Sequence, residues 1–191
     1  MHLRWPPAPL GLGPPLNLAL LAPTTRARLA RSWWLPPVLG VATALALFTA
    51  DRLLFGGATM AKTPALSAHP PAGSRVLVAF LGSLFEELVF RVALATVAAW
   101  IAYWLLRRTL SDPDHVIRVA QGIGVLVAVL GVGLMHVGQV GRPSEFWRIM
   151  TINAVGHVVY GWLFWRRGFE LAVLTHAVVT MLLYIGWPAL R

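Results

Sequence analysis

The 191-residue sequence contains no cysteine. Without thiols the chain can form no disulfide, no thiolate metal site and no cysteine nucleophile. Charged residues are also scarce, at 12% against about 25% in an ordinary soluble domain. Hydrophobic residues make up 58% of the chain, and its mean hydropathy is +0.69. This composition excludes an ordinary soluble domain and predicts an all-α, polytopic membrane protein.

Acidic residues are fewer than basic ones, 7 against 16, so that the formal net charge is +9. In a soluble protein this balance would favour nucleic-acid binding. Here the arginines gather at the ends of apolar runs, where they set topology and contact anionic lipid headgroups, and Lys62 is the only lysine. We therefore expect membrane lipid as a partner and no nucleic acid.

Several hydrolase signatures are absent as well. There is no His-Glu-x-x-His stretch, which excludes a zincin helix. The sequence has neither a Gly-x-Ser-x-Gly elbow nor a pair of membrane-embedded aspartates, which argues against serine and aspartyl intramembrane proteases. Nor does it contain a glycine-rich phosphate loop. Any reaction must therefore use other polar residues inside the membrane.

The apolar runs predict a transmembrane helix bundle of about five to six spans. The readable segments are 36–55, 75–106, 117–140, 146–165 and 169–187. The second segment is too long for a simple span of about 20 residues, so we expect either one strongly tilted helix or a helix broken near its charges. The glycines in the third segment, Gly122, Gly124, Gly131 and Gly133, allow close helix approach.

Residues 1–34 are interpreted as a cytoplasmic or interfacial tail, followed by a single transmembrane domain over 35–191. Prolines interrupt the one apolar patch of the tail, and arginines follow where a signal peptide would need its cleavage site. Trp33 and Trp34 end the tail as an interface anchor. Residues 56–73 are read as an external loop because they are rich in glycine and proline.

The distribution of basic residues predicts the orientation of the chain in the membrane. Those on the side of the N-terminus are Arg26, Arg28, Arg31, Arg107, Arg108, Arg166 and Arg167, and those on the other side are Lys62, Arg75, Arg142, Arg148 and Arg191. The excess favours a cytoplasmic N-terminus, in a bacterial inner (plasma) membrane. Asp51 and Arg52 lie near the far end of the first span, where both can reach the interface.

One stretch places three charges inside a long apolar run, namely Glu86, Glu87 and Arg91. Inserting a charge at membrane depth costs about 2.5–3.5 kcal/mol, so the default interpretation is functional. Glu87 and Arg91 stand four residues apart and can pair on one helix face, whereas Glu86 is turned away by about 100° and can face something else. The alternative is a salt-bridged cluster that only locks two helices together.

Further polar side chains lie in the later segments: His136, Asn153, His157, His176 and Thr180. A carboxylate in a low-dielectric site can act as general base on water near neutral pH. Neutral imidazoles can hold the same water, donate to an oxyanion or ligate a metal, and one glutamate with two histidines is a ligand set for catalytic zinc. Water activation for hydrolysis is the chemistry that this set suits best.

Three of these positions form an ordered pattern. Residues 86–91 read Glu-Glu-x-x-x-Arg, 132–136 read Val-x-x-x-His, and 176–180 read His-x-x-x-Thr. Over residues 75–185 the chain resembles the CAAX protease and bacteriocin-processing (CPBP) intramembrane endopeptidases. The motifs of that family are Glu-Glu-x-x-x-Arg, Phe-x-x-x-His and His-x-x-x-Asn/Asp, so this chain has Val for Phe in the second and Thr180 for the amide or acid in the third.

The resemblance implies that Glu86 is the base, that His136 helps to hold the water, and that His176 donates to the oxyanion. Glu87 and Arg91 would orient the site. The family is classed both as metallo-type and as glutamate-type. If a metal takes part, the resemblance implies a divalent ion such as Zn²⁺ held by Glu86, His136 and His176.

Thr180 departs from the family pattern, because a hydroxyl donates one hydrogen bond but lacks the reach of an amide. His157 and Asn153, four residues apart, could supply the missing amide, but we interpret them as helix packing.

The expected function is an intramembrane endopeptidase that cuts a membrane-associated peptide or protein near the membrane face. A prenylated tail, a bacteriocin leader and a sorting tail all remain open as substrates. The alternative is a non-catalytic transporter or scaffold whose buried charges form a proton or ion path. The sequence shows no internal repeat of the kind that many transporters have.

Overall fold

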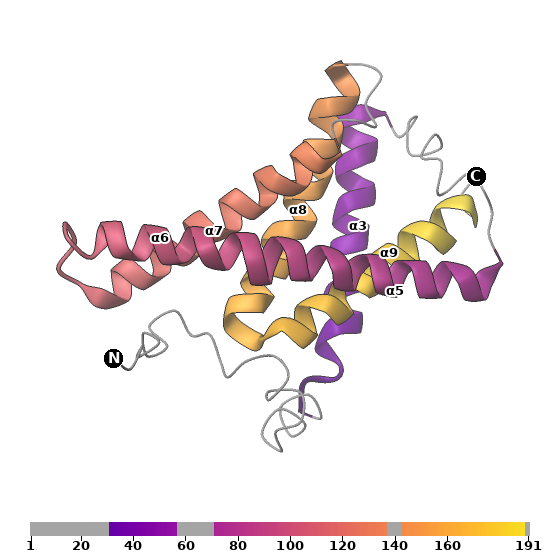
Figure 1. The fold of residues 1–191 in the computed structure, drawn as a ribbon. Helices are drawn as coiled ribbons and strands as arrows, with labels where there is room; N and C mark the ends of the chain where they lie inside the picture. The colour runs from indigo at the N-terminus through magenta and orange to yellow at the C-terminus, as the bar shows by residue number, and fades with distance from the viewer. Residues whose placement is uncertain (1–30, 57–70, 137–142, 190–191) are drawn as a thin grey trace.

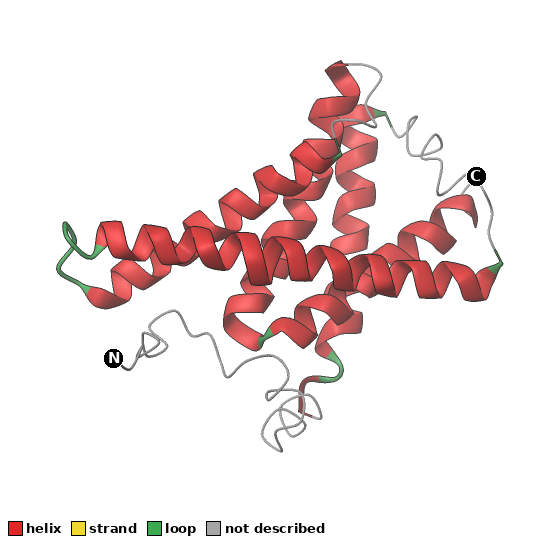
Figure 2. Ribbon diagram, viewed as in Figure 1, coloured by secondary structure: helices red, strands yellow, loops and turns green. Residues whose placement is uncertain are grey.

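The computed structural model describes residues 31–56, 71–136 and 143–189 of the chain. Within these residues the regular structure is helical, and no strand is present (Figure 1, Figure 2). The elements in chain order are α3 (Leu35–Phe55), α5 (Ala72–Glu87), η2 (Leu88–Ala95), α6 (Thr96–Leu106), α7 (Pro113–Met135), α8 (Pro143–Arg167) and α9 (Phe169–Ala189). The all-α class predicted from the sequence is confirmed.

Each predicted apolar segment appears as a helix in the described residues. Three helices are long and apolar enough to cross a membrane by themselves: Leu35–Phe55, Gly73–Leu106 and Pro113–Met135. The apolar part of α9, Phe169–Leu183, is shorter. Most of the predicted tail, residues 1–30, and most of the predicted external loop, residues 57–70, lie outside the described residues.

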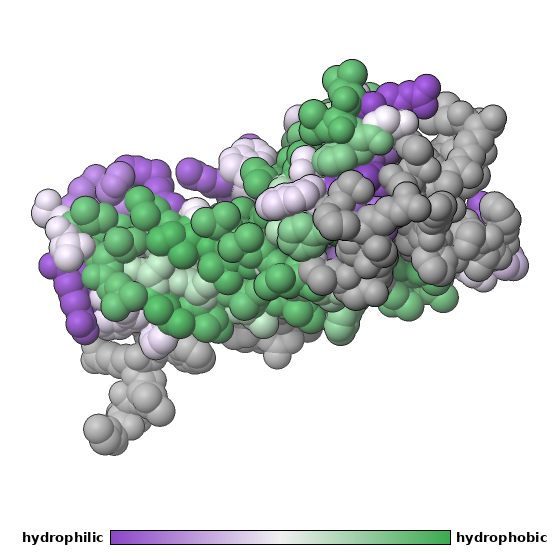
Figure 3. All heavy atoms as spheres, turned by 90° about the horizontal axis from the view of Figure 1, so that it is seen from above, coloured by the Kyte–Doolittle hydropathy of each residue, from purple (hydrophilic) through white to green (hydrophobic). Residues whose placement is uncertain are grey.

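The surface of the bundle is apolar and its interior holds charges. Leu53 is 77% exposed and Phe85 61% exposed, whereas Glu87 and Arg91 are completely buried. Figure 3 shows hydrophobic residues over much of the face that it presents, with hydrophilic ones at the end where α6 turns into α7. A soluble protein distributes its side chains the other way round, so this surface is suited to contact with lipid.

The long second segment is neither a plain α-helix nor broken. It runs without interruption from α5 through η2 into α6, and η2 is π-helical directly after Glu87. The Thr96 hydroxyl donates to the backbone oxygen of Arg91 at 2.9 Å, which satisfies a carbonyl in the widened turn. Single π-helical stretches inside α-helices are frequent at functional sites. The departure from α geometry falls where the sequence places its charges.

Close helix packing depends on small residues, as predicted for the third segment. A Cβ added to Gly124 of α7 would lie 2.5 Å from the backbone oxygen of Ala95 in η2. A Cβ added to Gly131 would lie 2.6 Å from the side chain of Leu94. Gly122, in contrast, faces open space and has no such contact within 4 Å. Helix α7 thus packs on η2, α6 and α8, while α9 packs on α3, α5 and α8.

The structure corrects the expectation that Asp51 reaches the membrane interface. Asp51 is 0% exposed and accepts a hydrogen bond from Nε of Arg148, itself nearly buried. The pair joins α3 to α8 because each helix supplies one charge. An aspartate inside an apolar bundle is tolerated where a cation compensates it, and long side chains need not reach water when they find each other. Arg148 was one of the basic residues counted on the side opposite the N-terminus. Because it pairs with Asp51 inside the bundle, it no longer belongs in that count.

Candidate active site

The charged stretch of the sequence lies at the junction of α5 and η2, where this helix meets α8 and α9 (Figure 1). Glu86 and Glu87 are the last residues of α5, and Arg91 follows in η2. Because neighbouring residues on a helix differ by about 100°, the two carboxylates face different surroundings. Glu87 is completely buried, whereas the Glu86 side chain is 24% exposed.

The predicted pairing of Glu87 with Arg91 is present. Nε of Arg91 lies 3.4 Å from Oε2 of Glu87, and both side chains are fully buried. A second nitrogen of Arg91, Nη2, donates to Nδ1 of His157 at 2.6 Å and to the backbone oxygen of His157 at 3.1 Å. One guanidinium therefore ties the charged helix both to its own carboxylate and to α8.

His176 enters the site from α9. Its Nδ1 lies 3.0 Å from Oε1 of Glu87, a hydrogen bond in which the imidazole N–H donates to the carboxylate. The other ring nitrogen, Nε2, lies 3.8 Å from Oε2 of Glu86. The structure thus brings Glu86, Glu87 and His176 together, and the separation of Glu86 and His176 is within the range expected for a water-bridged contact.

The second side chain facing Glu86 is His157, which the sequence led us to interpret as helix packing. Nε2 of His157 lies 3.8 Å from Oε2 of Glu86. Asn153 does not share this position, because its amide donates to the backbone oxygen of Ile149 within its own helix. The pairing of α8 with η2, which only the tertiary structure decides, turns His157 inward.

His136 lies outside this group. It follows α7 directly, is partly exposed, and donates from Nδ1 to the backbone oxygen of Val132 at 2.8 Å. Its predicted role as the partner of Glu86 stays a prediction, because the next residues, 137–142, lie outside the described residues.

Thr180 lies one turn of α9 beyond His176 and contacts the charged helix. Its hydroxyl is 3.3 Å from that of Ser83, which is buried one turn before Glu87. This contact joins α9 to α5 beside the carboxylates. A threonine at this position can thus help to fix the two helices, and its predicted part in the chemistry stays a prediction.

Tyr160 was not singled out in the sequence, yet its ring covers both imidazoles. It stacks on His176 with ring centroids 4.4 Å apart and planes at 16°, and its ring meets that of His157 edge-on at 5.5 Å. Tyr160 is buried and lies three residues after His157, hence on the same face of α8. The sequence signal that could have identified Tyr160 is its spacing of three residues from a histidine within an apolar helix.

Three side chains of the group carry atoms of the kind that ligate metals. One ligand atom each from Glu86, His157 and His176 lies within 4.8 Å of the others. A guanidinium only donates, so Nδ1 of His157 must accept from Arg91, and the proton of the neutral ring is on Nε2. A protonated nitrogen cannot ligate, and two remaining ligands fall short of the three that catalytic zinc usually takes. With His157 in this tautomer, Glu86, His157 and His176 do not fit a zinc ion, and the predicted set of Glu86, His136 and His176 stays a prediction.

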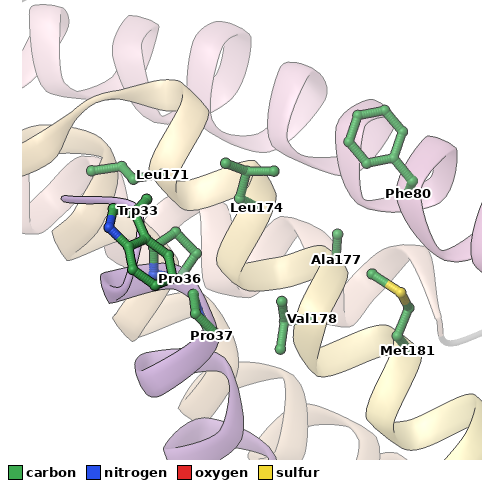
Figure 4. Close-up of a pocket in the computed structure, with 9 residues that line it drawn as sticks. All are labelled: Trp33, Pro36, Pro37, Phe80, Leu171, Leu174, Ala177, Val178 and Met181. Atoms are coloured by element: carbon green, nitrogen blue, oxygen red, sulfur yellow. The ribbon is translucent and has the colours of Figure 1, made fainter. Parts of the chain in front are cut away.

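An apolar pocket of about 310 Å³ lies where the start of α3 meets α5 and α9. Figure 4 shows that its walls come from the start of α3, from α5 and from α9. The lining residues are Trp33, Pro36, Pro37, Phe80, Leu171, Leu174, Ala177, Val178 and Met181. Ala177 directly follows His176 in α9, so the pocket and the charged group occupy different faces of one helix.

Comparison with known proteins adds one result to this geometry. The sequence profile described as "Type II CAAX prenyl endopeptidase Rce1-like" matches residues 69–182, more than half of the chain. No curated protein and no solved structure matches the chain. The matched range contains all the site residues described above, from Ser83 to Thr180.

Proposed function

Because this chain belongs to the Rce1-like family of type II CAAX prenyl endopeptidases, we propose that it is a membrane-embedded protease in which Glu86 activates water for peptide-bond hydrolysis. The family indicates the protease, and the mechanism is our proposal. The observation that carries it is the difference in burial and in bonding partners between the two carboxylates. Glu87 is buried, ion-paired with Arg91 and hydrogen-bonded to His176, whereas Glu86 is partly exposed and faces two ring nitrogens at 3.8 Å.

A distance of 3.8 Å is too long for a direct hydrogen bond, so the Glu86 carboxylate is not held by either imidazole. A water molecule that contacts Glu86 can also contact the ring nitrogens. Because Nδ1–H of His176 donates to Glu87, Nε2 of the neutral ring carries a lone pair and can accept from such a water. We therefore propose that His176 positions the water, in place of the oxyanion role implied by the resemblance.

In the proposed reaction, the water oxygen bonds to the carbonyl carbon while Glu86 takes one of its protons. The carbonyl electron pair moves onto oxygen, giving a tetrahedral intermediate. This intermediate collapses with cleavage of the C–N bond, and Glu86 returns the proton to the leaving amine. Glu87 and Arg91 do not react, and they hold the two imidazoles in place.

The apolar pocket supports a substrate with an apolar portion, such as a lipid-modified peptide, because its lining offers almost no polar atom. Orientation remains part of the proposal. The balance of basic residues favours a cytoplasmic N-terminus in a bacterial inner membrane.

The test compares wild-type protein with Glu86→Gln in liposomes that contain a membrane-tethered peptide. We expect cleavage to fall by about 10²–10⁴-fold, because the amide keeps the shape of the side chain and removes the base. The melting temperature in detergent should stay close to that of wild type, since among the described residues Glu86 faces its two histidine neighbours only at 3.8 Å, beyond a direct hydrogen bond. A chelator should leave wild-type cleavage unchanged. Full cleavage by Glu86→Gln would refute the proposed base.

A further inference from the structure

We infer that His157 is a catalytic hydrogen-bond donor, which presents Nε2–H to the carbonyl oxygen of the substrate as negative charge develops there. Arg91 is the positioning residue that holds His157 in this tautomer. The inference rests on the proposed function and adds a residue to it, since neither the motif pattern nor the family match assigns a role to His157.

The tautomer of His157 follows from the chemistry of its neighbour. A guanidinium has five N–H donors and no acceptor, so the 2.6 Å contact requires a lone pair on Nδ1 of His157. The same nitrogen of Arg91 also donates to the backbone oxygen of His157, which fixes the guanidinium relative to the ring. The single proton of the neutral imidazole is therefore on Nε2, the atom that faces Glu86 at 3.8 Å.

His176 has the opposite arrangement. Its Nδ1 faces the carboxylate of Glu87, which only accepts, so Nδ1 carries the proton and Nε2 the lone pair. Both Nε2 atoms lie 3.8 Å from Oε2 of Glu86. A cation behind one ring and an anion behind the other thus give Glu86 one donor and one acceptor as neighbours.

Because one histidine offers a donor and the other an acceptor, the two can have different roles in hydrolysis. The acceptor, His176, suits a water that gives its proton to Glu86. The donor, His157, suits the oxygen that gains negative charge when the water attacks. The oxyanion role that the resemblance implied for His176 is therefore better served by His157, on a different helix.

The packing around His157 keeps the donor in place. The ring meets Phe90 edge-on at 6.2 Å and Tyr160 edge-on at 5.5 Å, and the residue is nearly fully buried. A donor fixed before the reaction costs no reorganisation when the charge appears.

The decisive experiment compares His157→Gln with His157→Leu in the liposome assay. The amide of Gln offers an oxygen to Arg91 and an N–H to the site, whereas Leu offers neither. We expect His157→Leu to lose about 10²–10³-fold in kcat and His157→Gln to recover at least a tenth of the wild-type value. Equal loss in both variants would show that the imidazole itself is needed, and near wild-type rates in both would show a packing role. Either result overturns the inference.

A second measurement reads the tautomer of His157 in the wild-type protein, and a variant serves only to assign the signal. The ¹⁵N spectrum of histidine-labelled wild-type protein in detergent should show a protonated Nε2 and an unprotonated Nδ1 for His157, identified by the signal missing in His157→Gln. The reverse pattern overturns the inference. If Glu86→Gln abolishes cleavage while both His157 variants remain active, the proposed function stands and only the role of His157 falls. If wild-type protein does not cleave, the proposed function fails first.

Discussion

Two groups of buried charges lie inside this bundle, and they differ in how their charges balance. Asp51 on α3 meets Arg148 on α8, one anion against one cation. At the α5–η2 junction two carboxylates, Glu86 and Glu87, lie near the single guanidinium of Arg91, which is paired with Glu87. The charges of the first group cancel. The second group has one more carboxylate than it has guanidinium groups.

The comparison shows which buried charges are suited to packing and which to chemistry. A matched pair can be replaced by apolar side chains at little cost in stability, because the attraction between its charges does little more than offset the cost of their desolvation. A carboxylate in excess has no such partner, and Glu86 is also the more exposed of the two, so it can reach a substrate. The following predictions test this distinction, from the largest expected effect to the smallest.

Asp51→Ala should destabilise the protein by about 3–5 kcal/mol, because Arg148 is left as an uncompensated buried charge. The double variant Asp51→Leu with Arg148→Met should regain most of that stability. Thermal melting in detergent measures both, and the cleavage rate per folded molecule should stay at the wild-type level. A wild-type melting curve for Asp51→Ala would contradict the pairing of α3 with α8.

Arg→Lys substitutions at the two groups should have different consequences. Arg91 uses Nε toward Glu87 and Nη2 toward His157, and a lysine has only one nitrogen for both. We expect Arg91→Lys to lower kcat by roughly 10²-fold through misplacement of His157. The matched control, Arg148→Lys, keeps its single contact to Asp51 and should retain wild-type kcat. The measurement is kcat from steady-state kinetics in liposomes. Equal values for the two variants would contradict the distinction between a packing pair and a catalytic group.

Tyr160→Leu removes the ring that stacks on His176, at an expected cost of about 0.5–1.5 kcal/mol beyond its lost buried area. Tyr160→Phe keeps the ring and should melt close to wild type. The melting temperatures of the two variants separate the contribution of the ring from that of the hydroxyl. If Phe is as destabilising as Leu, the hydroxyl and not the stacking is responsible.

Thr180→Val should have the smallest effect, about 1 kcal/mol, since it leaves the buried hydroxyl of Ser83 without this partner. Adding Ser83→Ala should return part of that loss, because the unpaired hydroxyl is then removed. Melting curves of the single and double variants give the coupling. A fall in kcat of more than about 10-fold for Thr180→Val would support a part for its hydroxyl in oxyanion binding.

The sequence was sufficient for the class of protein, for the helical segments and for the pairing of Glu87 with Arg91. Each of these depends on local properties. Long apolar runs exclude an ordinary soluble domain, and a spacing of four residues brings two side chains together within one helix, whatever the rest of the chain does. For the same reason the resemblance could be read from short motifs and agrees with the family match.

Only the tertiary structure decided which side chains from different helices meet. Two histidines, His136 and His157, were both available as neighbours of Glu86, and nothing local distinguishes them. The packing of α8 on α3, α7 and α9 turns His157 toward the carboxylates and turns Arg148 toward Asp51. Rotation of a helix about its own axis is set by its contacts with other helices. The tautomers that we infer for His157 and His176, and the division of roles that we propose around Glu86, rest on those contacts between helices.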